Sequence, residues 1–302
     1  MEMMYLDARD NHKIPIYYEK NKNEKLSVQI VHGLFDSSNR YFDFMEDLKQ
    51  MGASVAIMDI RGHNKAIENA SDSLYLGEFN GWNNATDDVQ VVNSFIKANG
   101  KPNILIGYGM GADIIRTFII KYGHETDGVI LVSPGEYIDK IKYSIYSKYL
   151  DIIASTKNLQ YRSVKLRDKV LKKLNRKFGH RVSFDYYTSD LYFQDQLNKN
   201  PLIAGIPTVG LWKSYLSARQ KIQNDYAQKY IPADLKILFV CGEKDTVGGG
   251  VRKQKELVDF YASKGKNATL KFIKNGRYDL YHDNTKDQYL SIVRDFIENE
   301  II

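Results

Sequence analysis

A strand that runs through closely spaced glycines into a helix is the segment of this chain that most clearly suggests chemistry. It covers residues 104–112, with the sequence ILIGYGMGA. The pattern is typical of a nucleophile elbow, in which small flanking residues permit a sharp turn and the central side chain projects above a sheet. A serine there attacks a carbonyl carbon after a histidine, oriented by an acid, has taken its proton, and two backbone N–H groups bind the oxyanion. The central residue here is Gly109, which has no side chain that could attack.

The same segment also fits a dinucleotide-binding loop of the G-x-G-x-x-G/A kind, with Gly107, Gly109 and Ala112 at the three small positions. Three predicted strands precede it, however, whereas such a fingerprint usually opens its domain. Asp113 is also too close to serve as the carboxylate that binds the ribose. The nucleophile elbow is therefore the favoured interpretation, and no cofactor is expected.

The elements that must position this turn alternate between short apolar runs and helical patterns. Strands are predicted at 14–18, 26–31, 54–58, 103–107, 128–133, 235–240 and 268–273. Helices are predicted at 39–51, 85–98, 110–122, 251–264 and 289–298. Buried strands that alternate with helices predict an α/β fold, with a mostly parallel central sheet flanked by helices on both faces.

Residues 136–225 interrupt this alternation with helical patterns and a different charge balance. They contain 17 basic and 8 acidic residues, although the whole chain carries only +6. The predicted organisation is thus an α/β core made of residues 1–135 and 226–302, with 136–225 inserted as a helical lid.

The most basic part of this insertion, 157–181, has ten Lys or Arg residues and one acid, Asp168. Such a run is either a solvated helix face or a surface for an anionic lipid, an acidic protein or nucleic acid. Tyr161 and Phe178 are too few to make a stacking platform, so nucleic acid is not expected. The candidate contact residues are Lys172, Lys173, Arg176 and Lys177.

Composition restricts the class of protein further. A stretch of about 18 apolar residues is absent, and charges interrupt the N-terminal residues, so neither a membrane span nor a standard signal peptide is expected. The single cysteine, Cys241, excludes an internal disulfide, and the six histidines form no metal-binding pattern. A cytoplasmic protein without a metal is the expectation.

Several motifs, taken in order and spacing, carry a resemblance to a known group of proteins. They are His32-Gly33-Leu34, Arg40-Tyr41, Asp59-Ile60-Arg61-Gly62-His63, the elbow, Val129-Ile130-Leu131-Val132-Ser133-Pro134 and Gly242-Glu243-Lys244-Asp245. The chain resembles, nearly end to end, the α/β-hydrolases grouped as serine aminopeptidases, monoacylglycerol lipases and lysophospholipases. The resemblance implies the α/β-hydrolase fold.

The resemblance also assigns roles to individual positions. It implies that Asp245 is the catalytic acid and that the backbone N–H groups of Leu34 and Met110 form the oxyanion hole. The family histidine lies in a Gly-Arg-His loop, where this chain has Tyr278. A phenol, with a pKa of about 10, is a poor general base compared with imidazole at about 6.5. With Gly109 at the nucleophile position, the triad is degenerate.

The remnant residues have a structural interpretation. The elbow residue is usually held at positive φ, which glycine adopts without a Cβ penalty, so Gly109 should stabilise the fold. Tyr278 is expected to donate its hydroxyl hydrogen to Asp245, which would otherwise be a buried carboxylate without a partner.

Replacement catalysts have to be weighed against ordinary structural roles. His282 lies one helical turn beyond Tyr278 and is a possible substitute base. Ser37 and Ser38 are expected to cap the next helix, and Cys241 to pack in the core. The imidazoles of two further histidines, His32 and His63, are expected to shape their loops through hydrogen bonds.

Taken together, these features predict a non-hydrolytic pseudoenzyme with a pocket for an acyl or other apolar small molecule. One alternative is an active ester hydrolase that uses a substitute nucleophile or an activated water. The other is a protein-interaction module that acts through the basic lid.

Overall fold

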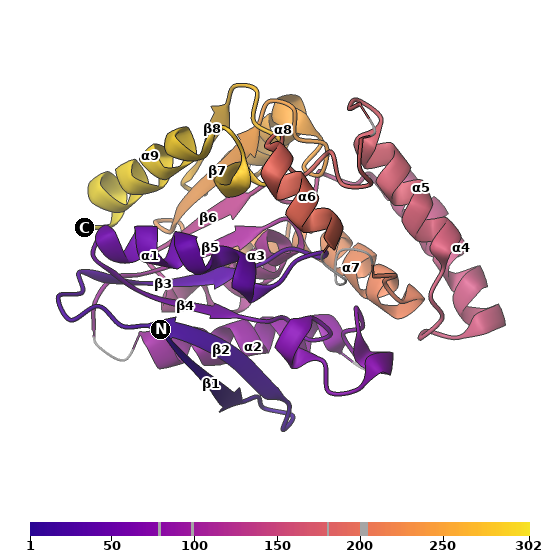
Figure 1. The fold of residues 1–302 in the computed structure, drawn as a ribbon, viewed down its shortest axis with the longest axis horizontal. Coiled ribbons are helices and arrows are strands. Elements are labelled where there is room, and N and C mark those ends of the chain that lie inside the picture. Colours follow the sequence, from indigo (N-terminus) through magenta and orange to yellow (C-terminus); the bar gives the residue numbers. More distant parts are fainter. Residues whose placement is uncertain (78–79, 98–99, 180, 200–204) are drawn as a thin grey trace.

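The computed structural model describes residues 1–77, 80–97, 100–179, 181–199 and 205–302 (Figure 1). Position 98, the predicted end of one helix, lies outside the described residues, as do positions 180 and 200–204 of the predicted lid.

One eight-stranded sheet organises the described chain, in the order β1-β2-β4-β3-β5-β6-β7-β8. Its strands are β1 (Glu2–Asp7), β2 (Lys13–Glu19), β3 (Leu26–Val31), β4 (Ala53–Met58), β5 (Asn103–Tyr108), β6 (Gly128–Val132), β7 (Lys236–Gly242) and β8 (Ala268–Ile273). Strands β1 and β2 pair antiparallel and all later pairs are parallel. The predicted α/β class with a mostly parallel sheet is confirmed.

Helices cover both faces of this sheet (Figure 1). They are α1 (Phe42–Gln50), α2 (Gly81–Ile96), α3 (Met110–Tyr122), α4 (Lys140–Lys157), α5 (Val164–Asn175), α6 (Leu191–Lys199), α7 (Val209–Ile222), α8 (Gly250–Ser263) and α9 (Lys286–Phe296). Strand β5 shows how the two faces are divided, because successive side chains of a strand point to opposite sides. Leu105 packs into the core under α2, α3 and α8, whereas Ile104 and Ile106 pack into the core under α1 and α9. This alternation explains why a continuous apolar run forms a strand with two buried faces.

Helices α4, α5, α6 and α7 lie between the end of β6 at Val132 and the start of β7 at Lys236. In Figure 1, α4 and α5 lie at the edge of the molecule, far from the sheet, while α7 lies closer to it. The rings of Trp82 on α2 and Tyr215 on α7 stack 5.4 Å apart, which joins the insertion to the core. None of the helices in the described ranges is long and apolar enough to cross a membrane. The division of the chain into core and lid stays a prediction.

Candidate active site

Gly109 forms the sharp turn between β5 and α3, with φ +52° and ψ −110°. Its N–H donates to the carbonyl of Val132 at 2.9 Å, and its own carbonyl accepts from the N–H of Asp113 at 3.1 Å. Residues with a Cβ are strained at such a positive φ, whereas glycine adopts it freely. Gly111 is needed for a different reason, since a Cβ there would collide with the carbonyls of Val31 and His32. The turn therefore has the geometry of a nucleophile elbow.

The side chain of Tyr278 occupies the space into which a nucleophile at position 109 would project. A Cβ placed on Gly109 would lie 2.5 Å from the Tyr278 hydroxyl oxygen and 3.2 Å from two of its ring carbons. The same hydroxyl lies against the position of a Cβ on Gly33. Tyr278 is 3% exposed. The glycine at 109 and the tyrosine at 278 are thus sterically matched, because the larger ring fills the volume that the missing side chain leaves.

Tyr278 is a neutral phenol in this environment. Burial, reinforced by the carboxylate of Asp36, raises the pKa of the hydroxyl well above its ordinary value. A phenol that holds its proton this firmly is neither a general base nor a nucleophile at neutral pH.

Asp245 lies just after β7 and is 1% exposed. Its carboxylate accepts hydrogen bonds from the backbone N–H groups of Val247 at 2.8 Å and Gly248 at 3.0 Å. Burial raises the pKa of this carboxyl to about 6, and the two N–H groups offset part of that shift. The hydrogen bond expected from Tyr278 to Asp245 is not formed. That prediction was wrong, because the phenol reaches toward Gly33 and Gly109 instead.

The loop that carries Leu34 is held by two histidines. His63 Nε2 lies 2.6 Å from the carbonyl oxygen of Leu34. His32 Nδ1 lies 2.8 Å from the carbonyl oxygen of Gly33, and its Nε2 accepts from the N–H of Ile60 at 3.1 Å. The prediction that these histidines shape the loop is confirmed. The segments 33–34 and 109–110, which contain the two predicted oxyanion-hole residues, flank the Tyr278 hydroxyl.

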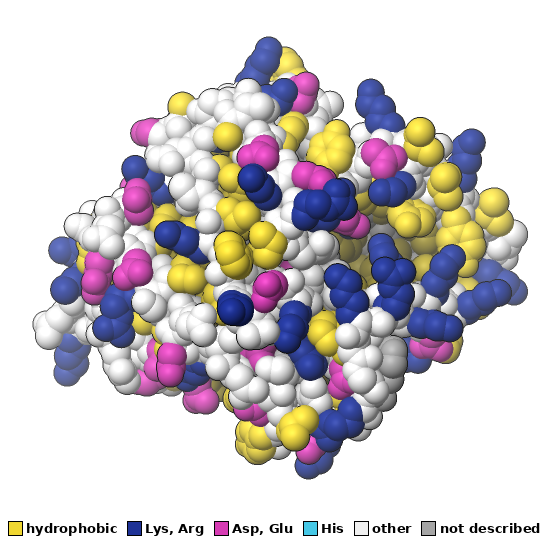
Figure 2. Space-filling model, turned by 90° about the horizontal axis from the view of Figure 1, so that it is seen from above, with side chains coloured by type: hydrophobic (Ala, Val, Ile, Leu, Met, Phe, Trp, Pro, Cys, Tyr) yellow, Lys and Arg dark blue, Asp and Glu magenta, His cyan; other side chains and the backbone are white. Residues whose placement is uncertain are grey.

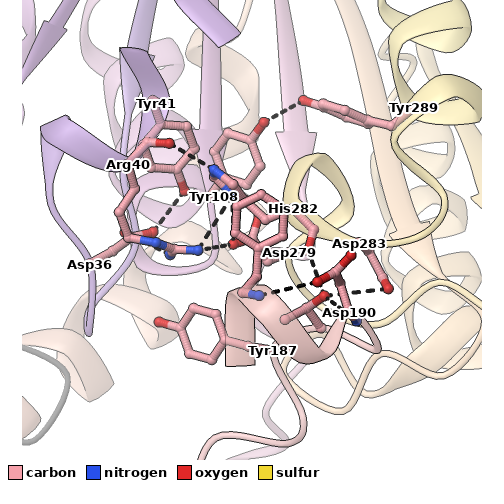
Figure 3. Close-up of polar contacts among 12 residues, drawn as sticks. Asp36, Arg40, Tyr41, Tyr108, Tyr187, Asp190, Asp279, His282, Asp283 and Tyr289 are labelled. Carbon is pink, nitrogen blue, oxygen red and sulfur yellow. Dashed lines mark hydrogen bonds and ion pairs between the residues drawn. The ribbon is translucent and has the colours of Figure 1, made fainter. Parts of the chain in front are cut away.

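His282, the possible substitute base, is part of a buried polar network (Figure 3). Its Nε2 lies 2.7 Å from the carbonyl oxygen of Arg40, and its Nδ1 lies 2.9 Å from a carboxylate oxygen of Asp279. Because both ring nitrogens are engaged, the imidazole has no free nitrogen with which to take a proton from water or a substrate.

Arg40 is the centre of this network, which the sequence analysis did not predict. Its guanidinium contacts Asp36 at 2.9 Å and also pairs with Asp279 (Figure 3). Burial alone would raise the pKa of the Asp279 carboxyl, but the charges of His282 and Arg40 hold it well below its usual range. The spacing of Asp36 and Arg40, four residues apart, was the one local signal in the sequence.

Residues 184–190 of the insertion form a covering segment above Tyr278. The ring of Tyr187 meets the ring of Tyr278 edge-on at a centroid distance of 4.9 Å, and Tyr186 packs beside it. The Tyr187 hydroxyl donates to the carbonyl of Phe35 at 2.9 Å. The covering segment thereby closes the region over Gly109 with aromatic side chains.

Hydrogen bonds fasten this covering segment to the loop that contains Tyr278. The N–H of Asp279 donates to the carbonyl of Tyr187 at 2.8 Å, and Arg277 Nη1 donates to the carbonyl of Thr188 at 2.8 Å. The carboxylate of Asp283 accepts from the N–H of Ser189 at 2.9 Å and from the N–H of Arg277 at 2.8 Å. Asp283 therefore binds both segments at once.

The remaining candidate nucleophiles have structural roles. Ser37 precedes a short 3-10 helix, but its hydroxyl contacts Asn39 at 2.5 Å and makes no cap bond, contrary to expectation. The carboxylates of Asp36 and Asp59 accept the N–H groups of Ser37 and Ser38 instead. Cys241 is fully buried, and burial raises the pKa of its thiol to about 12, so it is not a thiolate nucleophile.

The residues around the elbow do not favour a dinucleotide or metal site. The carboxylate of Asp113 is buried and accepts from Arg116 at 2.9 Å, from Tyr215 at 2.8 Å and from the N–H of Gly135 at 3.1 Å. It is therefore committed to the core. Among the described residues, no group of three His, Cys, Asp or Glu side chains is placed to bind a metal ion.

Two described cavities lie away from Gly109. The larger, of about 340 Å³, is bordered by Gly81, Trp82, Thr117, Ser214 and Lys221. The smaller, of about 170 Å³, lies beside His12, Arg61 and Glu68. Neither is lined by Tyr278 or Gly109.

Comparison with known proteins adds independent findings. The family model described as serine aminopeptidase, S33, matches residues 22–285. The chain is similar to monoglyceride lipase of Saccharomyces cerevisiae, with 22% identity over 280 residues, which is 89% of this chain and 82% of that protein.

Solved structures show a similar arrangement. A highly thermostable carboxyl esterase from Bacillus coagulans, in complex with glycerol, superimposes with a TM-score of 0.88 at 18% identity and covers 100% of this chain and 99% of its own. A soluble variant of the Saccharomyces cerevisiae monoglyceride lipase, in complex with a substrate analogue, gives a TM-score of 0.77 at 16% identity over 100% and 96% of the two chains.

Proposed function

The chain belongs to the serine aminopeptidase S33 family and has the α/β-hydrolase fold, and we propose that it is a member that does not hydrolyse esters. The observation that carries this proposal is the contact between Gly109 and Tyr278. The nucleophile is absent, and the phenol that stands at the histidine position fills the space where a serine side chain would lie. Both losses therefore belong to one packed arrangement.

An active hydrolase with a substitute nucleophile or base is the competing function. The contacts of the described residues weigh against it. His282 has both ring nitrogens engaged, Cys241 is buried as a thiol, and Tyr278 holds its proton. Each of these groups lacks the property that nucleophilic or general-base catalysis requires.

A fluorophosphonate probe, which forms a covalent bond with activated nucleophiles, tests this proposal. The wild-type chain should show no added mass in intact mass spectrometry. The Gly109→Ser/Tyr278→His variant should gain one adduct, mapped by peptide sequencing to position 109. A wild-type adduct that disappears on Asp245→Ala would contradict the proposal.

Binding of an acyl or other apolar small molecule is a second candidate role, and the aromatic lining of the same region supports it. Phe35, Phe184, Tyr186 and Tyr187 are all buried and pack around Tyr278. Since these rings fill the region over Gly109, a ligand would have to displace the Tyr187 ring and its hydrogen bond to Phe35.

Native mass spectrometry with added monoacylglycerols of increasing chain length tests this second role. We expect Tyr187→Ala to bind at least as well as the wild type, because truncation opens the space that a ligand would need. Leu191→Ala, a substitution at an exposed position of α6, is the matched control. Equal and negligible binding by all three proteins would remove this role.

A further inference from the structure

Helix α4 carries a stripe of apolar side chains on its solvent-facing side. Ile141 is 74% exposed, Ile145 60%, Tyr149 40% and Ile152 64%. Steps of four, four and three residues place these side chains on one face of a helix. Leu150 is the buried hydrophobic residue of α4, at 5% exposure. The usual amphipathic arrangement, with the large apolar side chains turned inward, is thus inverted.

The inversion requires an explanation, because a single exposed apolar side chain is common but a continuous stripe is not. The three isoleucines of the stripe lose a favourable burial for as long as they face water. A stripe of this kind therefore marks a surface that is covered when the protein acts.

The charge around the α4 stripe indicates what covers it. Residues 140–177, which contain α4 and α5, carry 12 Lys or Arg residues and two acids. Lys148 lies on the α4 surface next to the stripe, and the Nζ of Lys169 on α5 lies 5.8 Å from the ring centre of Tyr149. Figure 2 shows hydrophobic and basic side chains side by side at the end of the molecule where Figure 1 places these helices.

We propose that α4 and α5 dock the protein on an anionic lipid bilayer. The stripe enters the boundary between headgroups and acyl chains, and the basic residues, including Lys172 and Lys173, contact the anionic headgroups. Helices with an apolar stripe beside lysines bind membrane surfaces in this way. Each Lys or Arg close to an anionic surface adds to the attraction.

Other occupants fit the same features less well. A second copy of the chain would bring two strongly basic surfaces together, and their repulsion opposes association. A folded acidic protein would need a groove shaped to a protruding helix, whereas a bilayer receives the helix without a preformed shape. Both remain outcomes that the experiment below distinguishes.

Co-sedimentation of the full chain with lipid vesicles tests the proposal. We expect binding to phosphatidylcholine vesicles that contain phosphatidylserine or phosphatidylglycerol, and much weaker binding to phosphatidylcholine alone. Ile145→Ser/Ile152→Ser removes apolar side chains from the stripe, and Lys172→Glu/Lys173→Glu reverses two charges. Each double variant should bind anionic vesicles at least about tenfold more weakly.

The matched controls change equally exposed residues elsewhere. Leu191 on α6 is 62% exposed, and Lys255 and Lys274 are exposed outside the insertion. Leu191→Ser and Lys255→Glu/Lys274→Glu should bind like the wild type. Ile141→Ser is a second stripe variant, in case one double variant fails to fold by circular dichroism.

Three results would overturn the proposal. The first is a wild-type chain that does not bind anionic vesicles. The second is binding that the stripe variants leave unchanged. The third is self-association in analytical ultracentrifugation without vesicles that the stripe variants abolish, which would assign the surface to a second copy.

Discussion

The hydroxyl oxygen of Tyr278 lies 2.5 Å from the point where a Cβ on Gly109 would stand. These two positions are 169 residues apart in the sequence, yet each determines what the other can hold. A serine at 109 needs a smaller ring at 278, and the tyrosine at 278 needs a glycine at 109. A single reversion is therefore expected to harm the fold before it restores any chemistry.

Gly109→Ser alone should lower the free energy of unfolding by about 2–4 kcal/mol, from positive-φ strain and overpacking against Tyr278. Adding Tyr278→His should restore at least about 1 kcal/mol of this loss through relief of the contact. Urea unfolding of the four proteins of this cycle measures the coupling. Gly179→Ser is the control, since a Cβ there meets nothing within 4 Å. Additive effects of the two substitutions would show that the positions are not coupled.

Asp245 should make stability fall as the pH rises from about 4 to about 6. Its pKa is raised to about 6 in the folded chain, against about 3.9 when unfolded. The folded state then binds the proton more tightly, so this contribution is complete below pH 4 and is lost as the pH passes 6. Relative to Asp245→Asn, the wild type should lose on the order of 3 kcal/mol over this range.

Thermal and urea unfolding between pH 4 and pH 8 measure this difference. Asp295, which is exposed on α9, is the matched control, and Asp295→Asn should show no comparable change relative to the wild type. A difference between the wild type and Asp245→Asn that stays constant with pH would mean that the Asp245 carboxyl titrates as it does in the unfolded chain.

His282→Ala should destabilise the chain by about 3 kcal/mol, because it removes a partner from the buried carboxylate of Asp279 and from the carbonyl of Arg40. Denaturant unfolding beside His124→Ala, at an exposed position, measures the effect. If stability is unchanged and an ester hydrolysis activity disappears, His282 is a catalytic base and its structural assignment is wrong.

Asp283→Ala should loosen the covering segment, residues 184–190, without unfolding the sheet. The substitution removes the acceptor for the N–H groups of Ser189 and Arg277. Hydrogen exchange in 184–190 should become about tenfold faster, equivalent to about 1.4 kcal/mol, while β5 and β6 keep their protection. The exposed residue Asp259 supplies the control, and the same uptake in Asp283→Ala and Asp259→Ala would refute this role.

Most of the sheet could be predicted from the sequence because its central strands are short apolar runs with two buried faces. Strand β1 was missed, since its apolar residues Met3 and Tyr5 are exposed and stand among charged ones. It is an edge strand, held by antiparallel pairing with β2 rather than by a buried face. Local patterns carry little information about such a strand.

Within the candidate site, sequence reasoning found the positions but not all of the contacts. Alignment of Tyr278 with a histidine suggested a bond to Asp245, but a phenol is longer than an imidazole and its hydroxyl reaches Gly33 and Gly109. The pairing of Arg40 with Asp279 joins residues 239 positions apart, which no local spacing could indicate.

Hydrolysis of short- and medium-chain p-nitrophenyl esters tests the central claim most directly. The wild type, Asp245→Ala and Gly109→Ser/Tyr278→His should be compared with buffer alone. We predict that the wild type matches the uncatalysed rate and that the double variant turns over. A wild-type rate above background that Asp245→Ala abolishes would contradict the claim and would require a nucleophile other than position 109.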